Sequence, residues 1–308
     1  MNSLRVSILI VIFFSFKVTG LTQIESLENF KANLESENVD STFKLLNERL
    51  LHLNSEHAND SIIVNTLKYK LYLSDSLKSQ MEKHYALEEL ISFPELLTSK
   101  QYCYYLMREG DAQVNIGGVA VAMDFYFQAV RVAESINNDT LLFKIYRRIG
   151  INYMKSSDYP LSLKYLTKAK GIALNMSDFQ KEASCNMSIG NSYKNQKIYD
   201  SAMVYYTKSI ELAKQVGWES GLAGNYNNIG NVKRRQGFIN ESIDYFNLAI
   251  EMNTITNNKM WLSYNYNNIG ESYLLLSQYS KALDYYKRSQ LIKVKLNDRY
   301  SQKASLFN

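Results

Sequence analysis

Apolar and aromatic positions recur along this chain at the spacing of α-helices. Residues 41–53, 62–73 and 77–91 each carry apolar side chains three and four positions apart, which is typical of an amphipathic helix. From about residue 103 onward the pattern becomes stricter, because apolar, small and aromatic positions return in the same order every forty residues. Only two prolines occur in the chain, and 46% of its residues are hydrophobic. The pattern therefore predicts a folded, all-α chain.

Glycine marks the forty-residue period. In five successive units it stands at the same phase, at Gly110, Gly150, Gly190, Gly230 and Gly270. Small residues follow twelve and nineteen positions later, at Ala122, Ser162, Ala202, Ser242 and Ala282 and then at Ala129, Ala169, Ser209, Ala249 and Ser289. Aromatic residues lie between the two small ones, at Phe125, Tyr126, Tyr165, Tyr205, Tyr206, Tyr245, Phe246, Tyr285 and Tyr286.

This spacing predicts two helices in each unit. The glycine and the apolar residues around it share one face of a first helix, and the small–aromatic–small set shares one face of a second. Glycine inside a helix costs roughly 1 kcal/mol relative to alanine, so its recurrence needs a steric reason. We expect the two helices to cross at the glycine too closely for a Cβ atom. The small residues would form the holes and the tyrosines the knobs of this contact.

Residues 227–251, NNIGNVKRRQGFINESIDYFNLAIE, carry the clearest copy of the unit. It resembles the tetratricopeptide repeat, a helix–turn–helix unit with Gly or Ala at position 8 and small residues at positions 20 and 27. The usual unit has 34 residues, and this longer one is similar to those of bacterial peptide-receptor regulators and of animal scaffolds of the kinesin-light-chain kind. The resemblance implies a right-handed superhelical solenoid of antiparallel helix pairs.

The repeats divide the chain into four predicted parts. Residues 21–102 lack the glycine phase and are expected to form divergent helical pairs that cap or extend the stack. Five repeats occupy residues 103–302, with a turn expected near Asp298, and residues 303–308 would begin a sixth, incomplete repeat. We interpret the chain as the N-terminal portion of a longer protein; the alternative is a short capping helix that happens to resemble the repeat.

Residues 1–20 are predicted to be a secretory signal peptide. Arg5 precedes an apolar run at 6–16, and Val18 and Gly20 place small residues at the cleavage site. The run is shorter than the roughly 20 apolar residues of a membrane-spanning helix, although a retained anchor is the alternative. We expect an exported, periplasmic or secreted protein of bacterial type. Cleavage would remove two cations and lower the formal charge from +5 to +3.

The sequence offers no catalytic constellation. The three histidines show no metal-ligand spacing, and no phosphate-binding loop or nucleophile turn is present. Cys103 and Cys185 lie about two repeats apart, too far for a disulfide in a stack, so we expect buried or free thiols. We therefore predict a protein that is not an enzyme and that has no cofactor and no metal.

Recognition is the function that the resemblance implies. In such a stack the first helices line a concave groove, into which defined repeat positions point. Here those positions hold Arg147, Arg148, Asn191, Lys194, Asn195, Asn227, Asn228, Asn231, Arg234, Arg235, Asn267, Asn268 and Glu271. An asparagine amide both donates and accepts hydrogen bonds, which suits the backbone of an extended peptide. Arginine adds bidentate contacts to carboxylates. A solvated polar face is the alternative, since asparagine is about a tenth of the whole chain.

The predicted partner is a protein or an extended peptide. The family's carboxylate clamp for a chain terminus is matched by Asn191 and Asn228, but its cation positions hold Met187, Tyr264 and Asn268. The low net charge does not favour nucleic acid. Contact with a membrane is expected only if the signal is retained or a C-terminal segment follows. We keep as an alternative function the N-terminal extracytoplasmic sensor region of a longer signal transducer, a histidine kinase or DNA-binding regulator.

Overall fold

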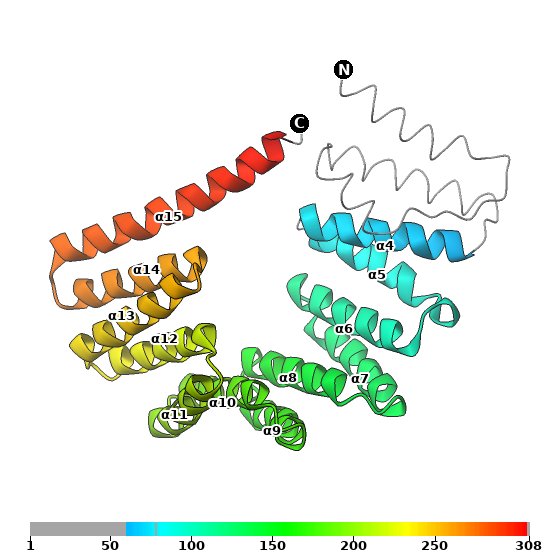
Figure 1. Ribbon diagram of the computed structural model, residues 1–308, viewed down its shortest axis with the longest axis horizontal. Coiled ribbons are helices and arrows are strands. Elements are labelled where there is room, and N and C mark those ends of the chain that lie inside the picture. Colours follow the sequence, from blue (N-terminus) through cyan, green and yellow to red (C-terminus); the bar gives the residue numbers. More distant parts are fainter. Residues whose placement is uncertain (1–59, 78, 307–308) are drawn as a thin grey trace. The chain divides into compact units, whose positions relative to one another are not determined.

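The computed structural model describes residues 60–77 and 79–306 (Figure 1). Every regular element in these residues is helical, which confirms the all-α prediction. The predicted signal peptide at residues 1–20, the first helical segment at 41–53 and the last two residues of the chain lie outside the described residues. The chain divides into two compact units, and the second of them, Leu97–Arg299, contains the repeats.

Within the first unit, two helices pack against each other. They are α4 (Asp60–Leu77) and α5 (Gln80–Ile91), and the short 3-10 helix η1 (Pro94–Leu96) follows them. Leu67, Leu87 and Leu90 are fully buried between them. The side chain of Ser79 accepts a hydrogen bond from the Glu82 amide and so caps the start of α5.

The second unit is a solenoid of antiparallel helix pairs. The pairs are α6 (Ser99–Asn115) with α7 (Val119–Ser135), α8 (Asp139–Lys155) with α9 (Tyr159–Asn175), α10 (Phe179–Asn195) with α11 (Tyr199–Gln215), α12 (Glu219–Arg235) with α13 (Ile239–Ile255), and α14 (Lys259–Leu275) with α15 (Tyr279–Leu306). Each even-numbered helix is the first helix of a repeat. Successive first helices from α6 to α12 also contact each other directly. Short turns join the elements, and most contain one residue with positive φ, such as Gly237 or Asn257.

The glycine of each repeat marks a close helix crossing, as predicted. A Cβ atom on Gly190 would lie 2.7 Å from the ring of Tyr206, and one on Gly110 would lie 2.6 Å from Tyr126. The same contact recurs at Gly150, Gly230 and Gly270 against Leu166, Phe246 and Tyr286, at 2.7 Å in each case. The knob is therefore the residue sixteen positions after the glycine, and it is an aromatic ring in four of the five repeats.

The aromatic residue one position earlier has a different role. Tyr205 stacks on Tyr193, with ring centroids 5.5 Å apart, and Tyr165 stacks on Tyr153 at 5.7 Å. Each pair joins the first and second helices of its repeat beside the glycine crossing, in a stacked geometry that aromatic rings favour. A third such pair, Tyr273 with Tyr285, lies in the last repeat, so three of the five repeats combine a knob with a stacked pair.

The turn predicted near Asp298 is absent, because α15 continues without a break from Tyr279 to Leu306. Asn297 and Asp298 have the residue types of the earlier inter-repeat turns, where Asn137 takes positive φ and Asp178 caps the next helix. Such a turn gives up helical hydrogen bonds, and it is stable only when the following helix packs back onto the preceding one. The prediction of a turn here is wrong, because residue type alone does not supply that packing.

Two further features of the described residues bear on function. No helix in residues 60–77 and 79–306 is both long and apolar enough to cross a bilayer. In the same residues, no group of three or more His, Cys, Asp or Glu side chains is placed to hold a metal ion. Cys103 and Cys185 are both buried free thiols, as predicted, and burial raises the pKa of Cys103 to about 11 and that of Cys185 to about 12.

Candidate functional site

The predicted groove residues lie on the first helices α8, α10, α12 and α14, and all of them are at least partly exposed. On α10, α12 and α14 their side chains form two linked clusters between neighbouring helices. We call this surface the polar seam. It consists of Asn191, Lys194, Asn227, Asn228, Asn231, Arg234, Arg235, Asn267, Asn268 and Glu271.

Between α10 and α12 the polar seam is centred on Lys194. Its Nζ atom donates to Asn191 Oδ1 at 3.3 Å and to Asn228 Oδ1, on the next repeat, at 3.1 Å. Burial, together with the nearby charge of Arg235, lowers the pKa of Lys194 to about 8. In the described part of the chain no carboxylate forms an ion pair with Lys194. Its recorded hydrogen-bond partners are neutral amide oxygens, which do not cancel its charge.

The hydroxyl of Tyr206 connects this cluster to the core. It donates to Asn191 Oδ1 at 2.8 Å, while its ring is the knob that covers Gly190. Both recorded bonds of Asn191 therefore end on its carbonyl oxygen. The position of Asn191 on the surface is thus set by a buried residue of the following helix.

Between α12 and α14 the polar seam is more fully paired. Asn227 Oδ1 accepts hydrogen bonds from Asn268 Nδ2 at 2.8 Å and from the buried Asn265 Nδ2 at 3.0 Å. Arg234 donates to Asn231 Oδ1 at 2.9 Å and forms an ion pair with Glu271 at 2.7 Å. The other oxygen of that carboxylate accepts from Asn267 Nδ2 at 2.8 Å.

Arg147 and Arg148 lie apart from the polar seam. The Nε atom of Arg148 contacts both carboxylate oxygens of Asp111 on α6, at 2.9 and 3.0 Å, and Asp111 also accepts from the hydroxyl of Tyr126 at 2.7 Å. The Nε atom of Arg147 is buried without a hydrogen-bond partner in the described residues. Most of the predicted groove residues are therefore brought together, whereas Arg148 belongs to a separate cluster with Asp111 and Tyr126.

Sequence reasoning missed Asp111, Asn265 and Tyr206 as parts of these clusters. Asp111 immediately follows a grid glycine, as Asn191 and Asn231 do, so its repeat phase could have identified it. Tyr206 was assigned to the core by its phase, whereas Asn265 was assigned no role; both are fully buried. No pattern in the sequence indicates that the hydroxyl of Tyr206 and the amide of Asn265 form hydrogen bonds with residues of the polar seam.

The balance of donors and acceptors indicates what the polar seam can bind. Asn191 and Asn228 use their carbonyl oxygens internally, and no acceptor for either Nδ2 group is found in the described residues. Lys194 carries an unpaired charge, and Arg235 is exposed with no ion pair in this part of the chain. The α10–α12 portion therefore presents a surplus of donors and positive charge, which suits carbonyl and carboxylate oxygens of a ligand.

Comparison with known proteins agrees with this architecture. Residues 183–216 and 221–290 match family models described as tetratricopeptide repeat. The chain contains tetratricopeptide repeats. The matched segments cover most of α10 and α12 and all of α14, so the polar seam lies on tetratricopeptide first helices. No curated protein matches the chain at a significant level.

Solved tetratricopeptide structures share the fold at low sequence identity. A Rap protein complexed with Competence and Sporulation Factor is 19% identical, with a TM-score of 0.60 over 90% of this chain and 79% of that chain. The Rap conjugation gene regulator of plasmid pLS20, in complex with a Phr peptide, is 15% identical, with a TM-score of 0.60 over 87% of this chain and 78% of that one. Aspartyl phosphate phosphatase F from Bacillus subtilis is 11% identical, with a TM-score of 0.62 over 76% and 71%.

Proposed function

We propose that the repeats form a non-catalytic scaffold that holds an extended peptide or protein segment on the polar seam. The observation that carries the proposal is the donor surplus between α10 and α12, where Lys194, Arg235 and the amides of Asn191 and Asn228 lack acidic partners in the described residues. A ligand with backbone carbonyls and acidic side chains would complete these hydrogen bonds.

Two further observations support this proposal. Structures with the same fold are named as complexes with a peptide or with Competence and Sporulation Factor. The α12–α14 portion is already cross-linked by Arg234 and Glu271, so it can hold the neighbouring α10–α12 surface in place without ordering cost on binding. The export signal at residues 1–20 stays a prediction, and the binding surface does not depend on it.

The test begins with an array of immobilised eight-residue peptides that differ in their number of Asp and Glu residues. We expect acidic peptides to bind the protein and peptides with the same composition but Lys in place of the acids not to bind. The best acidic peptide, labelled with a fluorophore, then serves as the probe for anisotropy titrations.

The double variant Asn228→Ala/Arg235→Ala should weaken binding of that probe by at least about tenfold, because charge-assisted hydrogen bonds are worth roughly 1.5–3 kcal/mol each. The matched control is Lys155→Ala, which removes an exposed cation at the repeat position of Arg235 but on α8. Its affinity should stay within about twofold of the unmodified protein. Equal losses in both variants would indicate only non-specific charge attraction and would refute the proposed surface.

A further inference from the structure

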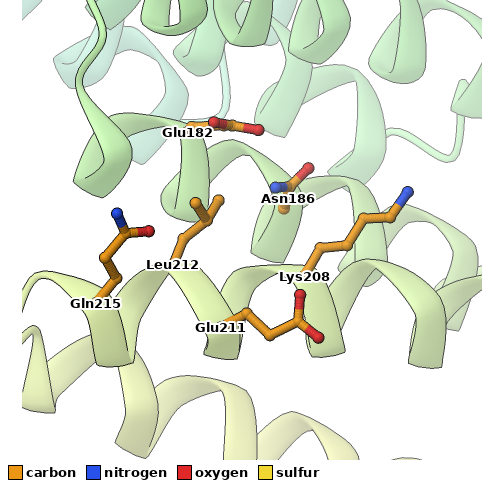
Figure 2. A pocket seen from close by; sticks show the side chains of 6 residues that line it. All are labelled: Glu182, Asn186, Lys208, Glu211, Leu212 and Gln215. Carbon is orange, nitrogen blue, oxygen red and sulfur yellow. The ribbon is translucent and has the colours of Figure 1, made fainter.

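A pocket lies between α10 and α11, and none of its lining residues belongs to the polar seam (Figure 2). Its volume is about 310 Å³, at the lower end of the range for small-ligand sites. Two lining residues come from α10 and four from α11: Glu182, Asn186, Lys208, Glu211, Leu212 and Gln215. Figure 2 shows the side chains of the two helices directed toward one another across this space.

The closed end of the pocket is formed by Asn186, whose exposed fraction is 0%. Neither its Nδ2 nor its Oδ1 atom has a hydrogen-bond partner in the described residues. A buried amide with both ends unpaired is strongly unfavourable and rare in folded proteins. The pocket therefore contains one donor and one acceptor that nothing in the surrounding helices satisfies.

The repeat explains why a space exists here. Asn186 stands four residues before the grid glycine, and the equivalent residues in three other repeats are Tyr146, Tyr226 and Tyr266. In the second repeat the ring of Tyr146 packs on Tyr165, with centroids 6.0 Å apart, and Lys168 Nζ lies 5.1 Å from its centre. In the third repeat Tyr205 and Lys208 are equivalent to Tyr165 and Lys168. The ring equivalent to Tyr146 is missing, because Asn186 stands at its position.

We propose that this pocket binds a hydroxyphenyl group in the space beyond the Asn186 amide, which is left open because asparagine is shorter than the tyrosine of three other repeats. The ring would lie against Leu212 and under Lys208 Nζ, in the cation–π arrangement that Lys168 forms with Tyr146. The hydroxyl would donate to Asn186 Oδ1 or accept from Nδ2. Glu182 forms an ion pair with Lys170 at 3.8 Å, and Lys208 and Glu211 both line the pocket, so the lining is close to neutral and favours an uncharged ligand.

Asn186 is fully buried, so a ligand reaches its amide only after neighbouring side chains move. Lys208 and Gln215 are exposed, and their flexible stems can swing aside without a change in the backbone. The source of the ring is either a tyrosine side chain of a partner protein or a small phenol, and both present the same chemistry. This site does not depend on the peptide-binding function proposed for the polar seam.

The first experiment titrates p-cresol and toluene into the chain labelled with ¹⁵N-asparagine and follows the side-chain amide resonances. We expect p-cresol to shift the Asn186 amide and to bind at least about fivefold more tightly than toluene, as one added hydrogen bond predicts. The variant Asn186→Ala should bind both compounds equally. If p-cresol shows no advantage over toluene in the unmodified chain, or does not shift the Asn186 amide, the proposal is wrong.

A second variant tests the shape of the pocket. Asn186→Tyr should restore the ring of the other repeats, raise the thermal unfolding midpoint and abolish p-cresol binding. Asn195→Tyr, at an exposed position of the same helix, is the control and should change neither quantity. A lower midpoint for Asn186→Tyr, or undiminished p-cresol binding, would overturn the proposal. N-acetyltyrosinamide then separates the two sources: binding of it favours a partner's tyrosine, and binding of p-cresol alone favours a small phenol.

Discussion

Two kinds of helix contact in this protein follow different rules. Within each repeat the glycine crossing is the same five times, with one knob covering one glycine at 2.6–2.7 Å. Between the first helices of successive repeats the contacts vary: Lys194 and Arg234, at equivalent positions, both bind asparagines at equivalent positions, but their remaining partners differ. Arg148 pairs with Asp111, Lys194 bridges two amides, and Arg234 pairs with Glu271. The repeated contact sets the shape of the solenoid, and the variable contacts set what its surface can bind.

The largest effect is expected from breaking the repeated contact. Gly190→Ala would place a Cβ atom 2.7 Å from the ring of Tyr206, which is fully buried and held by its hydroxyl. Overpacking of this kind typically costs about 1–3 kcal/mol, and the tightness of the site places the expected loss of unfolding free energy near the upper end. Urea unfolding followed by circular dichroism measures it.

The control for this variant is Gly171→Ala on α9. Gly171 is also helical, but a Cβ atom there would have no other atom within 4 Å. The higher helix propensity of alanine should therefore stabilise the protein by up to about 1 kcal/mol. Substitutions of the same type should thus have opposite signs, and equal signs would contradict a steric role for the grid glycine.

A smaller effect is expected at the variable contact between α12 and α14. Asn265 is fully buried, accepts from Asn253 Nδ2 at 2.8 Å and donates to Asn227. Asn265→Ala leaves the buried Asn253 amide without its acceptor and should cost about 2 kcal/mol of unfolding free energy. Asn267→Ala, on the partly exposed face of the same helix, should change it by less than about 0.5 kcal/mol. If the two variants lose similar amounts of unfolding free energy, the buried Asn253–Asn265 hydrogen bond does not stabilise the protein more than the exposed one does.

The last effect concerns the charge of Lys194 and is confined to alkaline pH. Its pKa in the folded protein is lowered from 10.5 to about 8, so between these values the unfolded chain binds more protons than the folded one. The unfolding free energy should therefore rise with pH from about 8 to 10 because of this residue. Lys194→Met should lack this increment, which appears as a difference between the two stability–pH curves. Parallel curves from pH 7 to 10 would contradict a lowered pKa.

The same titration affects binding. As pH rises through 8, Lys194 loses its charge, and the polar seam loses part of its attraction for acidic groups. Affinity for the acidic peptide probe should fall over this interval in the unmodified protein and change less in Lys194→Met. The pH dependence of peptide affinity tests the proposed function directly. A lysine that only stabilised the fold would change the stability–pH curve but not the affinity for the peptide.

The sequence predicted the repeated contact better than the variable ones. The recurring glycines mark every crossing, but the knobs were predicted to be tyrosines, and Leu166 rather than Tyr165 covers Gly150. The residues of the polar seam were predicted by position, yet their partners were not, because Asp111 and Asn265 depend on which side chain happens to face them in the next repeat. Asn186 shows the same limit: its departure from tyrosine is visible in the sequence, but the resulting space is visible only in the structure.

The choice between tyrosine and phenylalanine at the knob has a consequence for how such a surface can diversify. Tyr206 directs its hydroxyl to Asn191, which also accepts from Lys194, whereas Phe246 has no hydroxyl and the equivalent Asn231 accepts, within the described residues, only from Arg234. A single oxygen inside the solenoid thus decides whether a surface amide that binds a cation is also held by the core. Ligand preference in a repeat array can therefore change through substitutions that no ligand ever touches.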